Sequence, residues 1–256
     1  MTVFAIVSDI HANLEAFERV LEDIATKDIQ DIFCLGDIIG YGPNPRECLE
    51  LAQKYCRFSM IGNHEEAVMM IAEDFNDRAR QAVEWTRNQL NDKTVPREQR
   101  REYWNYLDKL QKMEMLEKGR FLFVHGSPRV PTKEYIMPRD VQDAGKMRAI
   151  FEMVPQVCFV GHSHVPGVYT EQDLRYIHPR QMKESKFEFP SESKIIINAG
   201  SVGQPRDQDP RACYITFTEE WVQFHRVFYN VSAVVEKIQN SGGLPQYLAD
   251  RLREGK

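Results

Sequence analysis

The stretch VFAIVSDIH, residues 3–11, is an apolar run that ends abruptly in polar residues. The same arrangement recurs: DIFCL leads to GD at 36–37, RFSMI to GNHEE at 62–66, RFLFV to HGSP at 125–128, VCFV to GHSH at 161–164, and KIII to NAGS at 198–201. Short continuous runs of β-branched and aromatic residues are typical of strands buried on both faces. The sequence therefore predicts buried strands that end in polar loops.

Helical patterns separate the early strands. The apolar residues of NLEAFERVLEDIA, 13–25, recur at helix spacing, with Leu14, Phe17, Leu21 and Ile24 on one stripe. In NPRECLELAQKY, 44–55, Asn44 is the expected N-cap residue of a second helix. Alternation of strand and helix predicts right-handed crossovers and mainly parallel pairing. Ligands of such sheets gather beyond the carboxyl ends of the strands, where the polar residues stand.

Residues 73–118 differ from this pattern. DRARQAVEWTRNQL and REQRREYWNYLDKL indicate two helices without a strand between them, expected as a helical insertion that either lies near the site or covers the sheet. After residue 165, GVYTEQDLRYIHP and CYITFTEEWVQFHRVFYN predict antiparallel hairpins, followed by helices that start near Val231 and Leu244. No repeat or linker marks a boundary, so residues 1–256 are expected to form a single α/β domain.

The composition excludes several classes of protein. With 42% hydrophobic and 28% charged residues, the chain can bury a core. No apolar run approaches the ~18 residues of a membrane span, and no basic leader precedes Asp9, so neither a membrane protein nor a signal peptide is expected. Five scattered cysteines without a CxxC pair favour a reduced, cytoplasmic protein. The net charge of −5 argues against stable binding to nucleic-acid backbones.

The polar residues at the strand ends are of the types that bind metals. They include five of the seven histidines of the chain. Imidazole nitrogen and carboxylate oxygen without thiolate suit Mn, Fe, Co, Zn or Ni. Two aspartates and several histidines exceed the ligands of one tetrahedral ion, whereas a pair of ions could use them all. The set comprises Asp9, His11, Asp37, Asn63, His64, His125, His162 and His164.

A shared carboxylate would join two such ions. Asp37 is the expected bridge, because each of its two oxygens could hold a different metal. Paired metals ~3.5–4 Å apart clamp the attacking and leaving oxygens of an in-line displacement at phosphorus. The residue types therefore indicate phosphoryl chemistry.

The motifs resemble those of the calcineurin-like metallophosphoesterases. They are D-x-H at 9–11, G-D at 36–37, G-N-H at 62–64, H-G at 125–126 and G-H-x-H at 161–164, in the family's order. NAGSVGQPRDQDPRACY, 198–214, is similar to a subgroup of compact bacterial and archaeal members. The resemblance implies a four-layer αββα sandwich, in which two mixed β-sheets pack face to face and helices flank them.

The resemblance also implies roles for individual residues. One metal would take Asp9, His11, Asp37 and His164, and the other Asp37, Asn63, His125 and His162. His64 resembles the family's histidine beside the substrate, which is not a ligand. The family commonly has aspartate where Glu65 stands, so a role of that carboxylate in orienting His64 could be altered.

The expected reaction is hydrolysis of a small phosphate ester: a phosphodiester, a phosphomonoester or a dinucleoside polyphosphate. A hydroxide shared by the metals would attack phosphorus, and His64 would stabilise charge or protonate the leaving oxygen. Four residues in loops that follow the motifs are candidate substrate contacts, and for each a surface or helix-capping role stays open: Tyr41, Asn44, Arg129 and Arg206.

Two other interpretations of the same motifs stay open. One is an inert protein-binding scaffold, as in a retromer subunit that resembles this family. The complete ligand set with His64 argues against it. The other is a DNA nuclease, which would need a basic track that this acidic chain lacks.

Overall fold

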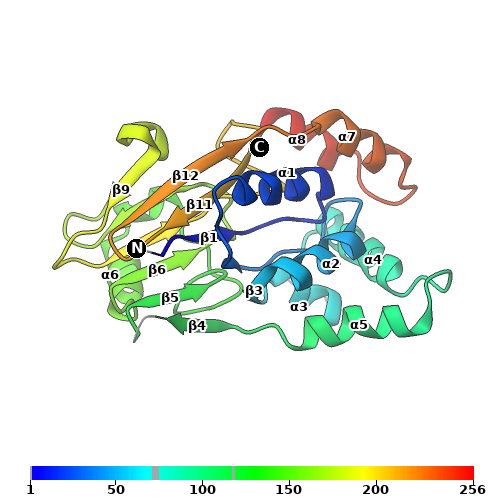
Figure 1. The fold of residues 1–256 in the computed structure, drawn as a ribbon, viewed down its shortest axis with the longest axis horizontal. Helices are drawn as coiled ribbons and strands as arrows, with labels where there is room; N and C mark the ends of the chain where they lie inside the picture. Colours follow the sequence, from blue (N-terminus) through cyan, green and yellow to red (C-terminus); the bar gives the residue numbers. More distant parts are fainter. Residues whose placement is uncertain (1, 71–74, 117–118) are drawn as a thin grey trace.

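The computed structural model describes residues 2–70, 75–116 and 119–256. Within them, the strands form two six-stranded mixed sheets with helices on the outside (Figure 1). The first sheet has the order β3 (Cys56–Ser59), β2 (Ile32–Cys34), β1 (Phe4–Val7), β11 (Ala212–Phe217), β12 (Trp221–Val227), β9 (Lys186–Glu188). The second has the order β4 (Met113–Leu116), β5 (Phe121–Val124), β6 (Val157–Val160), β10 (Ile195–Asn198), β7 (Gly167–Thr170), β8 (Arg175–Ile177). The expected αββα fold is confirmed.

Aromatic and aliphatic side chains fill the space between the two sheets. Ile6 and Phe33 of the first sheet share one fully buried cluster with Phe123, Phe159 and Ile197 of the second. The rings of Phe33 and Phe123 meet edge to face with centroids 5.4 Å apart. Each fully buried side chain of this size contributes ~1.5–3 kcal/mol. This shared core fixes the two sheets relative to each other.

Parallel pairing joins three neighbouring strands in each sheet, at one edge of the first sheet and among the inner strands of the second. It joins β1 to β2 and β2 to β3 in the first sheet, and β5 to β6 and β6 to β10 in the second. The other ladders are antiparallel, including the expected hairpins β7–β8 and β11–β12. The parallel pairing expected of the early strands is confirmed, and the later hairpins add antiparallel ladders, so that both sheets are mixed. The carboxyl ends of the parallel strands still converge, and they carry the candidate ligands.

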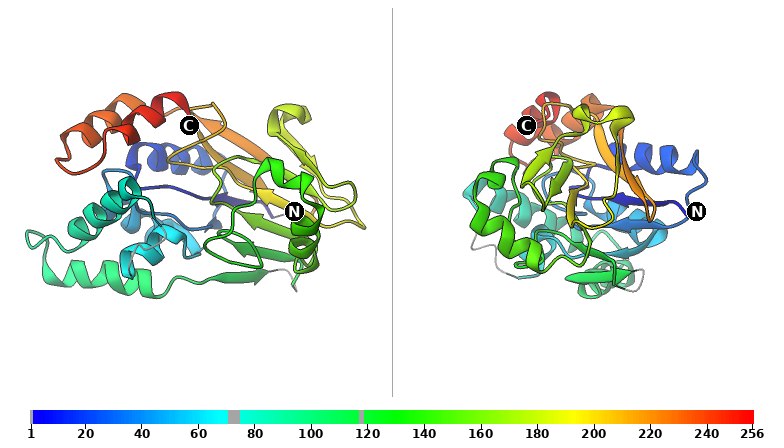
Figure 2. Two further views of the ribbon diagram at one scale, coloured as in Figure 1. Left: turned by 180° about the vertical axis from the view of Figure 1, so that it is seen from behind. Right: turned by 90° about the vertical axis from the view of Figure 1, so that its left-hand side faces the viewer.

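Helices cover the outer faces. Packing against the first sheet are α1 (Leu14–Ala25) and α2 (Pro45–Tyr55), and α6 (Ala144–Glu152) packs against the second. At one end of the molecule gather α4 (Asp77–Leu90), α5 (Arg97–Asp108), α7 (Val231–Asn240) and α8 (Tyr247–Glu254) (Figures 1 and 2). The remaining elements are α3 (Asn63–Met69) and the 3₁₀ turns η1 (Pro138–Gln142), η2 (Pro179–Gln181) and η3 (Lys183–Ser185). No helix among these described residues is long and apolar enough to cross a membrane.

The expected insertion forms α4 and α5, with no strand between them among the described residues. α4 packs on α3 and α2 and also joins the apolar cluster of α7 and α8 through Ala82. α5 packs on α2. The region is not helical throughout, because Met113–Leu116 form β4, an edge strand of the second sheet. Its expected limits at 73 and 118 lie outside the described residues.

The two early helices begin where the sequence predicts, with one difference in capping. Asn13 caps α1 by accepting from the Ala16 amide at 3.1 Å. On the predicted stripe Phe17 and Ile24 are buried, while Leu14 and Leu21 are half-buried at its edge. The Asn44 side chain precedes α2 without capping it, because its Oδ1 accepts from Lys237 Nζ at 3.0 Å.

Candidate metal centre

The candidate ligands come from loops that leave five different strands. Asp9 and His11 follow β1, Asp37 follows β2, and Asn63 opens α3 after β3. His125 follows β5, and His162 and His164 follow β6. All are buried except the half-buried Asn63. The fold therefore brings together the residues that the sequence placed at strand ends.

Four of these residues form a first cluster. One ligand atom from each of Asp9, His11, Asp37 and His164 lies within 4.8 Å of all the others. His164 Nε2 is 3.1 Å from Asp9 Oδ1, and His11 Nε2 is 3.6 Å from Asp37 Oδ2. These groups are close enough to hold one ion.

A second cluster shares Asp37 with the first. Ligand atoms of Asp37, His125 and His162 also lie within 4.8 Å of one another. Asn63 Oδ1 adds an oxygen 3.2 Å from His125 Nε2. Asp37 Oδ2 faces both clusters, 3.4 Å from His125 and 3.6 Å from His11, while Oδ1 accepts from the His64 amide at 2.9 Å. The geometry thus offers one shared oxygen, where the sequence analysis expected one oxygen for each metal.

Main-chain carbonyls orient the imidazoles. The Nδ1 atoms of His11, His125 and His164 face the carbonyls of Ile39, Leu35 and Gln204 at 3.3, 2.9 and 2.6 Å. His162 uses Nε2 in the same way toward Lys133 O at 3.3 Å. A hydrogen bond of this kind fixes the tautomer and leaves the opposite nitrogen as the ligand atom.

In the first cluster this orientation places two lone pairs against each other. His11 Nε2 and His164 Nε2 are 3.1 Å apart. Burial lowers the pKa of both imidazoles, so both are neutral at pH 7, and their protons reside on the carbonyl-bound Nδ1 atoms. Two facing lone pairs repel unless a cation lies between them. A separation of this size suits two nitrogens that bind one ion at ~2.0–2.1 Å each.

In the second cluster a proton on His125 can lie between the two facing imidazole nitrogens, where the first cluster needs a cation. Burial opposes protonation of His125, but the charge of Asp37 outweighs it and raises the pKa of His125 to about 9. Burial lowers the pKa of His162 to about 3, so this imidazole is neutral. Its Nδ1 lies 3.1 Å from His125 Nε2. Metal binding here must release the His125 proton.

The two aspartates stay ionised despite complete burial. Burial alone would raise the pKa of each. The positive charge that His164 gains at low pH outweighs burial for Asp9, and the charge of His125 outweighs it for Asp37, so both pKa values lie below the ordinary range. The Ser8 hydroxyl at 2.6 Å and the His162 amide at 3.1 Å also donate to Asp9 Oδ2. Both carboxylates are thus available as anionic ligands.

The backbone at the ligands is strained. Asp9, His11, Asp37, His162 and His164 all have φ between 48° and 62°, in the left-handed region that non-glycine residues seldom adopt. Such strain costs ~1–3 kcal/mol per residue and clusters at functional sites. Five strained residues in one place are therefore an independent sign of function.

Two positions of the motifs require glycine because side-chain oxygens of neighbouring residues lie where a Cβ would be. A Cβ at Gly62 would lie 2.1 Å from Asp37 Oδ1, and one at Gly161 would lie 2.0 Å from Ser8 Oγ and 2.5 Å from Asp9 Oδ2. Any side chain at either position would push an aspartate out of place.

His64 lies beside the first cluster without joining it. Its ring meets those of Tyr41, His11 and Phe75 edge-on, with centroids 4.2, 4.8 and 5.0 Å away. Nδ1 is buried against Gly40 and has no hydrogen-bond partner among the described residues. Burial lowers the pKa of His64 to about 4. A buried Nδ1 without an acceptor is best left unprotonated, so Nε2 carries the proton.

Glu65 does not orient His64. Its carboxylate is completely buried and accepts three main-chain hydrogen bonds: Oε2 from Asp37 N at 2.9 Å and Gly62 N at 2.8 Å, and Oε1 from Ile39 N at 3.1 Å. Burial, together with the charge of Asp37, raises the pKa of Glu65 to about 7. Glu65 therefore ties the loop of the shared ligand to the loop that carries Asn63.

The four candidate substrate contacts have different positions. Tyr41 packs on His64 and on His11, with ring centroids 4.7 Å apart for the latter pair. Arg206 is close enough for its charge to add to burial in lowering the pKa of His164. Arg129 instead pairs with Glu134 on the surface, and Asn44 pairs with Lys237, so the structure gives these two other partners.

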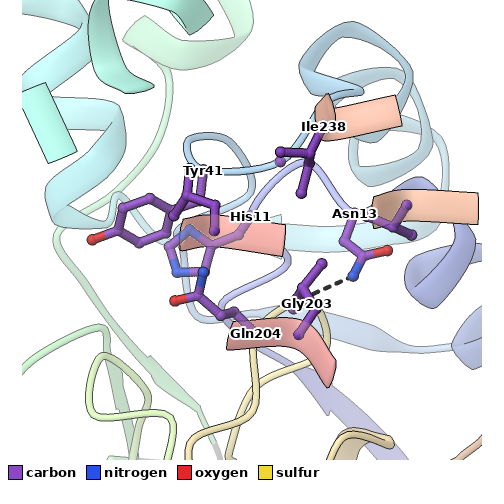
Figure 3. Close-up of a pocket in the computed structure, with 10 residues that line it drawn as sticks. His11, Asn13, Tyr41, Gly203, Gln204 and Ile238 are labelled. Atoms are coloured by element: carbon purple, nitrogen blue, oxygen red, sulfur yellow. Dashed lines mark hydrogen bonds between the residues drawn. The ribbon is translucent and has the colours of Figure 1, made fainter. Parts of the chain in front are cut away.

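Two neighbours of the centre, one aromatic and one polar, were not among the residues predicted from the sequence. Tyr135 stacks on His162 with centroids 3.7 Å apart and is 44% exposed. Gln204 supplies the carbonyl for His164 and lies beside His11 and Tyr41 (Figure 3). Gln204 falls in the 198–214 motif, whereas no local pattern marks Tyr135. The small cavity in this view has a volume of about 10 Å³, room for one water at most.

Comparisons with known proteins agree with the fold. The sequence model of the calcineurin-like phosphoesterase superfamily domain matches residues 1–220. An uncharacterized protein of Methanocaldococcus jannaschii is 36% identical over 100% of this chain and 99% of its own length. The crystal structure of a metallophosphoesterase from Sphaerobacter thermophilus matches with 38% identity and a TM-score of 0.82, covering 100% of this chain and 99% of the other. A hypothetical protein from Pyrococcus horikoshii shares the fold at 20% identity, with a TM-score of 0.76 and the same coverage. The chain belongs to the calcineurin-like phosphoesterase superfamily.

Proposed function

We propose that the protein hydrolyses phosphate esters with two divalent metal ions held by the two clusters. The observation that carries the proposal is the pair of neutral imidazoles, His11 and His164, whose lone pairs face each other at 3.1 Å. This arrangement is unfavourable without a cation. The sharing of Asp37 between two clusters supports a second ion.

The donor set narrows the choice of metal. It consists of imidazole nitrogens, carboxylate oxygens and the Asn63 amide oxygen, without thiolate. Such a set suits Mn, Fe, Co, Zn or Ni. When bound, the ions would stabilise charge on phosphoryl oxygens and lower the pKa of a water molecule toward ~7.

Two residues that are not metal ligands, Glu65 and His64, would support the reaction. The three Glu65 hydrogen bonds hold the Asp37 and Gly62 loops in register. His64 would donate from Nε2 to a phosphoryl oxygen or to the leaving oxygen, since its Nδ1 is buried and unpartnered. Its role beside the ligands is that of a charge stabiliser or a general acid.

The test is activity against a panel of phosphodiesters, phosphomonoesters and dinucleoside polyphosphates, with each candidate metal in turn. We expect hydrolysis of at least one class, lost on chelation and restored by metal, with close to two ions per chain by elemental analysis. An inert protein that carries both ions would instead support the scaffold interpretation. Stoichiometric loading with one ion would refute the dinuclear site.

A further inference from the structure

The ring of Tyr135 packs on a candidate metal ligand and is also open to solvent. It lies nearly parallel to the imidazole of His162, with centroids 3.7 Å apart and an angle of 24° between the planes. The residue is nevertheless 44% exposed. Since His162 covers one face, exposure of this size leaves the opposite face and an edge of the ring to the solvent. Tyr55 and Phe228, aromatic residues of similar or greater exposure, lie under cationic side chains instead.

Hydrogen bonds hold the loop that carries Tyr135. The Tyr135 carbonyl accepts from Lys146 Nζ at 2.7 Å, and the carbonyl of the next residue, Ile136, accepts from the Tyr169 hydroxyl at 3.0 Å. Two residues earlier, the Lys133 carbonyl faces the imidazole on which Tyr135 stacks, 3.3 Å from its Nε2. A ring held in this way loses little conformational freedom when a ligand packs on it. The open face of Tyr135 is therefore a preformed surface.

This surface lies beside the second cluster. His162 turns Nδ1 toward His125 Nε2, 3.1 Å away, and the two imidazoles share the cluster with Asp37. Tyr135 is one imidazole ring away from the ligand atoms of this cluster, because it stacks on His162 itself. In the proposed function the phosphoryl group lies at the buried clusters, so the organic group bonded to it must extend outward. The open face of Tyr135 lies where such a group can contact it.

We propose that the open face of Tyr135 stacks on a flat aromatic ring in the organic part of the substrate, so that the substrate is a phosphate ester of an alcohol that carries such a ring, as a nucleoside does. This inference rests on the proposed function, which places the phosphoryl group at the metal centre. A flat ring is the best match for an open aromatic face, because offset stacking brings the two faces into contact. Stacking of this kind accepts any base, since every base has a π-face.

Equilibrium binding tests the stacking without turnover. The probes are ribose 5-phosphate and adenosine 5′-monophosphate, titrated calorimetrically into Mn²⁺-loaded protein at fixed free Mn²⁺. Both carry the same phosphate and sugar, so the ratio of their dissociation constants isolates the ring. We expect adenosine 5′-monophosphate to bind at least ~5-fold more tightly, as for one stacked base. Tyr135→Leu should abolish this preference, and Tyr135→Phe should keep it, because phenylalanine retains the ring and loses only the hydroxyl.

Tyr55→Leu is the matched control, because Tyr55 is 43% exposed and lies at the end of α2 with its ring under Lys54. It should keep the full preference.

Three results would overturn the inference. They are no preference in the wild type, an unchanged preference in folded Tyr135→Leu, and a preference lost in Tyr135→Phe as well, which would assign the contact to the hydroxyl. If Tyr135 only shields His162 from water, Tyr135→Leu should weaken metal binding and both probes alike and leave their ratio unchanged. A wild type that shows the preference but hydrolyses no ester would refute the proposed function and leave the stacking surface standing.

Discussion

Replacing Glu65 with glutamine should weaken the hydrogen bonds that hold the loop of Asp37 in place, without removing any metal ligand. The Glu65 carboxylate accepts hydrogen bonds from the amides of Asp37, Ile39 and Gly62, at 2.9, 3.1 and 2.8 Å. Glutamine has nearly the same shape but only one oxygen. With that oxygen in place of Oε2 it could still accept from Asp37 and Gly62. Its amide group would then point N–H at the Ile39 N–H.

The magnitude follows from this mismatch. Burial raises the pKa of Glu65 to about 7, so the gain from hydrogen bonds to its charge is offset by the cost of burying that charge. The main loss in Glu65→Gln is the buried Ile39 donor left without an acceptor, and we expect the free energy of unfolding to fall by ~1–3 kcal/mol. Because Asp37 serves both clusters, metal affinity should fall as well, by the ~10–100-fold typical of lost outer partners.

Urea denaturation of metal-free protein measures the first effect, and competition with a chelating dye measures the second. Glu98→Gln, the same change at an exposed position on α5, should stay within ~0.5 kcal/mol of the wild type. Wild-type stability and metal affinity in Glu65→Gln would show that the loops keep their positions without the Glu65 carboxylate, and would refute the reasoning.

Other expectations follow from the site and the core. Chelation should abolish hydrolysis and Mn²⁺ should restore it, and Asp37→Asn should be among the most damaging changes; full activity in metal-free protein would contradict this. His64→Ala should leave both metals bound and slow alkyl esters by ~10²–10⁴-fold but aryl esters much less, since only the alkoxide needs a proton; equal losses would favour charge stabilisation instead. Long DNA and RNA should be poor substrates at physiological salt because of the net charge of −5, which rate comparison with small diesters would check. Burial lowers the pKa of His225 from 6.5 to about 4, so between these pH values the unfolded chain binds one more proton, and the free energy of unfolding falls as the pH drops from 6.5 toward 4. His225→Gln should reduce this fall, which urea denaturation at pH 7 and pH 5 measures. An equal loss of stability between the two pH values in both proteins would disprove it.

The sequence was sufficient to place the candidate ligands because local rules govern them. Asp9, Asp37 and His125 each end a continuous apolar run, and neighbouring parallel strands must bring such ends to one edge. The hairpins were equally local, since alternating residues around a polar turn define them. Parallel pairing of the early strands was predictable for a similar reason, because a helix separates each of them from the next.

The roles of Glu65 and Asn44 needed the structure because competing partners decided them. Asn44 was predicted at a helix start and Glu65 lies at another, but a side chain there can accept from its own helix or from elsewhere. The Asn44 oxygen accepts from Lys237 on α7, and the Glu65 carboxylate accepts from a neighbouring loop as well as its own helix start. Sequence spacing identifies a possible acceptor but does not identify the donor that reaches it.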